Sequence, residues 1–171
     1  MDENTPWRDK MREFAASRVA LSGLVLFALI VLAALAAPWL SMQDPYDLAQ
    51  LDIMDARLPP GSQAVDGRIF LIGSDEQGRD LLSAILYGLR ISLGVGVVST
   101  LIAVSVGLVI GLIAAYKGGR WDSIVMRIVD IQLSFPAILI ALILLAVLGQ
   151  GVGKIIAALV TVQWAYYART V

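Results

Sequence analysis

Apolar residues in this chain are gathered into four stretches that contain no Asp, Glu, Lys or Arg. The stretches are Val19–Gln43, Ile91–Tyr116, Ile131–Gly153 and Ile155–Ala168. A bilayer core about 30 Å thick is crossed by about 20 helical residues. The pattern therefore predicts an all-α protein, a polytopic bundle of transmembrane helices. The predicted crossings are residues 19–41, 91–116, 122–148 and 154–171.

Basic residues favour one orientation of these helices. Four of them (Arg8, Lys10, Arg12 and Arg18) lie before the first stretch, and three (Lys117, Arg120 and Arg127) lie around the end of the second. Because Lys and Arg are enriched on the cytoplasmic side, residues 1–18 and a turn at 117–121 are expected inside. Residues 42–90 and a turn at 149–153 are then periplasmic.

A cleavable signal peptide is the alternative interpretation of the first stretch. Ala34-Leu35-Ala36 has the A-x-A form of a cleavage site. The charge-free run continues past this site and three more apolar runs follow, which favours an uncleaved helix. Both interpretations place the next segment outside.

Residues 42–90 are polar and rich in turn signals, such as Leu58-Pro59-Pro60-Gly61. Ser74 and Gln77 have the spacing of a capping box. Apolar residues then recur at helical spacing from Leu81 to Leu89. We therefore expect a short amphipathic helix at about residues 75–89, lying on the outer side of the membrane at its interface with water.

Composition excludes several kinds of chemistry. The chain has no Cys and no His, and its net charge is −1. Disulfides, thiolate or imidazole metal sites and a Ser-His-Asp triad are therefore absent. No basic face is available for a nucleic acid. We expect a protein that is not an enzyme and that binds no cofactor or metal.

Small residues recur every fourth position in the second crossing. They are Ser99, Ala103, Gly107, Gly111 and Ala115. Such a ladder lets two helix backbones approach closely. The partner helix is either another helix of this chain, which the residues favour, or a helix of a partner subunit.

Polar residues and a proline lie together in the third crossing, at Asp130, Gln132, Ser134 and Pro136. Proline bends a helix, and Arg127 is spaced to pair with Asp130. Two interpretations stay open. One is an interfacial ion pair with a packing kink, and the other is the lining of a transport path.

Gly73 to Asp80 has the glycine spacing of a phosphate-binding loop, but Arg79-Asp80 stands where Lys-Ser or Lys-Thr is needed. The same segment lacks the ligand series of an EF-hand. Neither a nucleotide site nor a metal site is expected here.

A series of short motifs in this order resembles one known family. The motifs are Asp44-Pro45-Tyr46, Arg57-Leu58-Pro59-Pro60, Gly73-Ser74-Asp75, Gly78-Arg79-Asp80, Tyr87-Gly88-Leu89-Arg90-Ile91-Ser92-Leu93, Tyr116-Lys117-Gly118-Gly119, Met126-Arg127, Asp130, Phe135-Pro136 and Tyr167-Ala168-Arg169. Nearly the whole chain from Arg18 resembles the permease subunits of bacterial dipeptide/oligopeptide ABC importers, of the dipeptide permease C type. Gly73, Asp75, Gly78, Arg79 and Asp80 are the family-motif residues of the outer segment.

The resemblance implies a permease of the MetI-like type in the bacterial inner membrane, with four of six helices present, so that the chain is expected to be a fragment. It also implies alternating access driven by ATP hydrolysis in partner subunits. The implied partners are a homologous permease, two cytoplasmic ATPases, a periplasmic solute-binding protein and membrane lipid. Dipeptides, oligopeptides, glutathione and nickel chelates remain open as cargo. A membrane anchor or sensor whose outer segment binds a partner is the alternative function.

Overall fold

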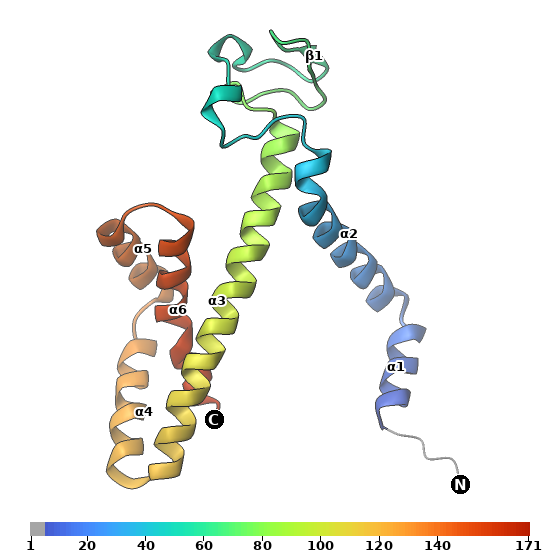
Figure 1. The fold of residues 1–171 in the computed structure, drawn as a ribbon. Helices are drawn as coiled ribbons and strands as arrows, with labels where there is room; N and C mark the ends of the chain where they lie inside the picture. Colours follow the sequence, from blue (N-terminus) through green and yellow to red (C-terminus); the bar gives the residue numbers. More distant parts are fainter. Residues whose placement is uncertain (1–5) are drawn as a thin grey trace. The chain divides into compact units, whose positions relative to one another are not determined.

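The computed structural model of the protein describes residues 6–171. The regular structure in this part of the chain is almost entirely helical, which confirms the all-α class. It forms two compact units, one ending at Arg90 and one running from Ile91 to Val171. The α-helices are α1 (Pro6–Ala16), α2 (Arg18–Leu40), α3 (Leu81–Lys117), α4 (Gly119–Leu133), α5 (Ala137–Leu148) and α6 (Val152–Arg169) (Figure 1).

In the first unit, α1 and α2 are separate helices because Ser17 between them is not helical. Ser17 has extended backbone angles, and its Oγ accepts a hydrogen bond from the Ala20 N–H at 3.2 Å. This is an N-cap, which satisfies one of the free N–H groups at the start of α2. Only Ala34 and Ala37 of α2 are buried. A helix that is apolar on every side and not covered by protein is suited to lipid.

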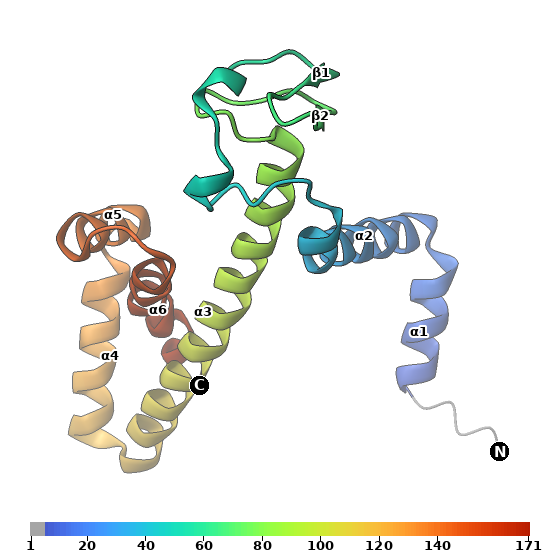
Figure 2. The same cartoon turned by 45° about the horizontal axis from the view of Figure 1, so that its top comes forward.

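Residues 41–80, which we call the α2–α3 segment, fold into short elements that gather at the beginning of α3 (Figure 2). These are the 3-10 helices η1 (Leu48–Gln50) and η2 (Ile53–Asp55) and the strands β1 (Ser62–Gln63) and β2 (Ile69–Phe70). The two strands are antiparallel, with Ser62 opposite Phe70. Phe70 of β2 and Ala64, which follows β1, are buried.

The short interfacial helix predicted at about residues 75–89 is not a separate element. Asp80 caps a helix that starts at Leu81, and its Oδ2 accepts from the Ser83 N–H at 2.8 Å and from the Ser83 Oγ at 2.5 Å. No proline lies between Leu81 and Lys117, so α3 continues to Lys117 without a boundary at residue 90.

The predicted capping box of Ser74 and Gln77 does not form. Ser74 Oγ instead donates to the Asp55 carbonyl and accepts from the Leu58 N–H at 2.8 Å. Residues 74–80 form a turn closed by a β-bridge between Ser74 and Asp80.

The second unit contains the rest of α3 together with α4, α5 and α6. Gly118 alone separates α3 from α4, with a positive φ of 61°, so the turn is shorter than the predicted 117–121. α6 lies between α3 and α4 (Figure 1). Val129 of α4 packs with Ala165 and Ala168 of α6 in a small buried core.

The third predicted crossing, residues 122–148, is two helices and not one. α4 and α5 meet at an angle of 86°. The break lies at Ser134-Phe135-Pro136, where Pro136 supplies no N–H to a helix and disfavours helical angles at Phe135. The proline therefore ends the helix, which is a larger effect than the expected kink.

Two helices of the described residues, α2 and α3, are long and apolar enough to cross a membrane, and α4 with α5 would make a third crossing if the pair is one broken span. α6 is not among them, since Lys154, Gln163 and Arg169 lower its apolar character. The crossing predicted at residues 154–171 stays a prediction.

Candidate functional site

The start of α3 is held by a buried side chain that the sequence analysis did not single out. Gln43 is 3% exposed and lies just after α2. Its Oε1 accepts from the Asp80 N–H at 2.7 Å, and its Nε2 donates to the Gln50 carbonyl at 2.8 Å. Asp80 is equally buried, and its Oδ1 has no hydrogen-bond partner in the structure. Asp80 therefore joins the cap of α3 to the α2–α3 segment.

Two family-motif glycines allow the backbone to fold back on itself. Gly73 and Gly78 have positive φ angles of 89° and 76°. A Cβ at Gly73 would lie 2.6 Å from the Leu58 carbonyl oxygen, and a Cβ at Gly78 would lie 2.1 Å from the Asp52 carbonyl oxygen. Both positions need glycine for its conformation and for space.

Asp75 and Arg79 hold the turn between these glycines. The Asp75 carboxylate accepts from the backbone N–H groups of Gln77 at 2.8 Å and Arg79 at 3.0 Å, and from Arg79 Nε at 2.7 Å. Burial raises the pKa of Asp75, but these hydrogen bonds and the Arg79 charge together outweigh it and lower the pKa below its ordinary value. All the hydrogen bonds of the Asp75 carboxylate are within the turn, which gives the motif a structural role.

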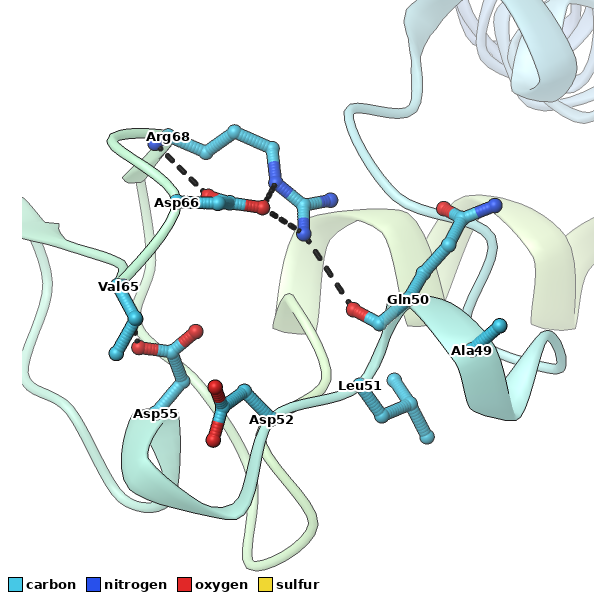
Figure 3. Close-up of a pocket in the computed structure, with 8 residues that line it drawn as sticks. All are labelled: Ala49, Gln50, Leu51, Asp52, Asp55, Val65, Asp66 and Arg68. Atoms are coloured by element: carbon cyan, nitrogen blue, oxygen red, sulfur yellow. Dashed lines mark hydrogen bonds and ion pairs between the residues drawn. The ribbon is translucent and has the colours of Figure 1, made fainter.

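A hollow of about 520 Å³ lies in the α2–α3 segment (Figure 3). Arg68 forms one side of it, donates to Asp66 Oδ2 through Nε at 2.5 Å and reaches the Met42 carbonyl at 3.0 Å. The hydrogen bonds that the Arg68 side chain and backbone N–H donate to Asp66 lower the pKa of Asp66. Among the described residues, no group of acidic side chains is placed to hold a metal ion. The full lining is Ala49, Gln50, Leu51, Asp52, Asp55, Val65, Asp66 and Arg68.

The small residues of α3 lie against α6 at two glycines. A Cβ built on Gly107 would lie 2.5 Å from the Trp164 carbonyl oxygen, and one on Gly111 would lie 2.8 Å from the Ala168 carbonyl oxygen. Backbone therefore meets backbone, and the close approach is within this chain.

The other ladder residues differ in burial. Ser99 and Ala103 are buried, but Ala115 is exposed and its neighbour Ala114 is buried. An α-helix turns about 100° per residue, so a strict four-residue ladder drifts by about 40° at each step. Four steps carry Ala115 off the packed face.

The polar residues around the α4–α5 break contact α6. Asp130 forms an ion pair with Arg169, not with Arg127 as its spacing suggested. The two helices bring these residues together across 39 positions of the chain. Gln132 Nε2 donates to the Thr161 and Val162 carbonyls, and Ser134 Oγ donates to the Asp130 carbonyl at 2.7 Å. Pro136 is exposed at the start of α5.

The sequence analysis therefore singled out residues of the turn before α3 and of the α4–α5 break, but it missed several of their hydrogen-bond and ion-pair partners. Gln43 and Asp55, both 3% exposed, gave no signal other than being polar. Arg169 was noted only as part of a family motif. A buried polar residue can be identified only when its distant hydrogen-bond partner is known.

Comparison with known families gives two matches that together cover most of the chain. Residues 5–60 match the N-terminal TM domain of oligopeptide transport permease C. Residues 107–171, which hold the α3–α6 glycine contact and the α4–α5 break, match the binding-protein-dependent transport system inner membrane component.

Individual relatives align along nearly the whole chain. The di/tripeptide transport system permease protein DppC of Pseudomonas aeruginosa is 37% identical over 96% of this chain and 54% of its own length. The glutathione transport system permease protein GsiD of Pectobacterium atrosepticum is 36% identical over 98% and 53%. The nickel transport system permease protein NikC of Escherichia coli K12 is 35% identical over 94% and 55%. The chain spans about half the length of the curated relatives it matches.

Membrane-length helices and the matched inner-membrane component define a membrane protein of the ABC transport permease class. Within that class, nearly the whole chain is similar to dipeptide and oligopeptide permeases of the C type.

Proposed function

We propose that this chain is part of the transmembrane permease subunit of an ATP-driven importer of di- or oligopeptides or related small solutes. The observation that carries the proposal is the packing of α3 on α6 through Gly107 and Gly111, within the region that matches the inner-membrane component. Contact between backbones ties a membrane-length helix rigidly to the helix that carries Arg169.

The α4–α5 break supports a transport path by alternating access. Non-helical backbone at membrane depth is tolerated only where protein covers it or where it lines a water-filled cavity. Ser134 and Pro136 are exposed in this chain, and Asp130 and Gln132 lie one turn away on α4. We propose that this break faces the path, while the rigid α3–α6 pair transmits the movement.

The energy for import would come from partner subunits. The Gly73–Asp80 turn, which has the glycine spacing of a phosphate-binding loop, is instead held by bonds of Asp75 within the turn and by Gln43. We propose that the protein works with a homologous permease, two cytoplasmic ATPases and a periplasmic solute-binding protein, as implied by its family. Residues 1–18 would then be cytoplasmic.

Uptake in a strain that lacks this gene tests the proposal. The complete gene product should restore ATP-dependent uptake of a radiolabelled dipeptide, with labelled glutathione and nickel as parallel probes. Gly107→Leu should abolish uptake, and Gly94→Leu should preserve it, because no atom lies within 4 Å of a Cβ at Gly94. Absence of uptake of all three probes with the wild-type gene product would refute the importer.

The alternative is a membrane anchor or sensor that binds a partner through the α2–α3 segment, and the hollow beside Arg68 is the observation that favours it. An anchor would retain a partner on affinity purification and would show no solute uptake. An Arg68→Gln substitution would then release that partner. The importer predicts copurification of ATPase subunits and a second permease.

A further inference from the structure

The amino-terminal helix α1 has an apolar face that the described part of the protein leaves uncovered. Trp7, Met11 and Phe14 are 74%, 63% and 42% exposed. At about 100° per residue these three positions fall within an arc of about 60°. Three large apolar side chains on one side of an 11-residue helix are not expected to face water.

Charged side chains occupy the rest of α1. The acids Asp9 and Glu13 lie about 130° or more from the centre of the apolar arc, whereas Lys10 lies about 70° from it. All three are exposed. Both negative charges of the helix therefore lie on the side away from its apolar face, where Arg12 also lies at about 130°, and Lys10 is the charged residue nearest to that face.

The position of α1 in the chain brings this face to a bilayer. α2 begins at Arg18 and has the length and hydropathy of a membrane span, and Ser17 alone separates it from α1. When α2 spans a bilayer, its amino end lies at one surface of that membrane. With 11 residues, α1 is too short to cross, since about 20 are needed.

We propose that α1 lies on the membrane surface, with Trp7, Met11 and Phe14 inserted at the boundary between headgroups and acyl chains. Its partner is a bilayer that contains anionic phospholipid. Tryptophan prefers that boundary. Pro6–Arg18 carries four basic side chains against two acidic ones, and basic residues next to a span are attracted to anionic headgroups.

The absence of cysteine from the sequence allows a site-specific test. A nitroxide label is placed at Met11→Cys, on the apolar face, or at Glu13→Cys, on the polar face, in the complete protein. The protein is reconstituted in vesicles of phosphatidylcholine with phosphatidylglycerol, or of phosphatidylcholine alone. Collision of the label with oxygen, which concentrates in lipid, is compared with collision with a water-soluble nickel chelate.

The label at position 11 should show an oxygen-to-nickel collision ratio several-fold higher than the label at position 13. Removal of phosphatidylglycerol should lower the ratio at position 11. The double substitution Lys10→Gln and Arg12→Gln should make that ratio independent of phosphatidylglycerol.

Equal ratios at positions 11 and 13 would overturn the proposal. So would a label at position 11 that is shielded from both oxygen and the nickel chelate, because α1 would then be packed against protein. A ratio at position 11 that does not respond to phosphatidylglycerol would refute the anionic-lipid part of the proposal.

Discussion

Single residues just before α3 determine whether the α2–α3 segment can adopt its compact fold. At Gly78 and Gly73 the backbone lies directly against another part of the α2–α3 segment, so that a Cβ would overlap a carbonyl oxygen. Asp75 then satisfies the N–H groups of the turn, and Asp80 caps the helix. Each of these residues acts through a bond or a close approach within the turn or to the segment that precedes it.

Gly78→Ala should therefore destabilise the α2–α3 segment more than Gly61→Ala. Both glycines have positive φ, at 76° and 81°, so both substitutions carry the left-handed penalty of about 1–2 kcal/mol. Only Gly78 adds a steric overlap, since no atom lies within 4 Å of a Cβ at Gly61. Limited proteolysis of the segment during thermal unfolding in detergent measures the difference. Equal protection in the two variants would contradict the close approach.

Asp75 predicts a dependence of stability on pH. Its pKa in the folded protein is below the ordinary 3.8. A carboxylate with a lowered pKa stabilises the fold above the unfolded value, and that contribution is lost as the pH falls from about 4 through the folded pKa. We expect proteolytic protection of the segment to weaken in this range. Asp75→Asn should lower protection at neutral pH and reduce the loss on acidification, whereas Asp9→Asn on α1 should change neither.

At the scale of elements, α6 organises the second unit because three helices lie against it. Gly107 and Gly111 of α3 approach its backbone, Val129 of α4 packs on Ala165 and Ala168, and α5 is in contact with it. Small residues make such contact close, and van der Waals packing supplies the stability in lipid.

Gly107→Leu should separate α3 from α6. A leucine side chain cannot fit where a Cβ alone would lie 2.5 Å from the Trp164 carbonyl oxygen, and overpacking of this kind costs roughly 1–3 kcal/mol or more. We expect a lower melting temperature in detergent for Gly107→Leu, and little change for Gly94→Leu, which is exposed on the same helix. A stable Gly107→Leu protein would show that the two helices do not pack through this glycine.

At the scale of the whole molecule, the distribution of basic residues bears on orientation. Lys117, Arg120 and Arg127 lie around the α3–α4 turn, and Arg8 to Arg18 precede α2. We predict that both regions are cytoplasmic and that the α2–α3 segment is periplasmic.

Cysteine labelling in intact spheroplasts checks this topology. A cysteine at Gln63, exposed in β1, should react with a membrane-impermeant maleimide before lysis. A cysteine at Ser123, exposed on α4, should react only after lysis. The reverse pattern would invert the topology, and the cysteine-free wild type supplies the blank.

Local sequence pattern was sufficient for the class of the fold. A helix needs only its own backbone hydrogen bonds in lipid, so the long apolar runs indicated α2 and α3 directly. The absence of Cys and His excluded disulfides, thiolate or imidazole metal sites and a Ser-His-Asp triad. The order of short motifs was enough to indicate the family that the chain resembles. None of these properties depends on how the helices pack.

Tertiary structure decided which residues meet. Asp130 was expected to pair with Arg127, its neighbour on α4, but it pairs with Arg169 of α6. Gln43 reaches Asp80 across 37 positions, and Gly107 lies against Trp164. The same proline that suggested a kink ends α4 with a turn of 86°. The physical reason is that a local pattern specifies which face of a helix is polar, small or apolar, whereas the partner of that face depends on how distant segments of backbone pack together.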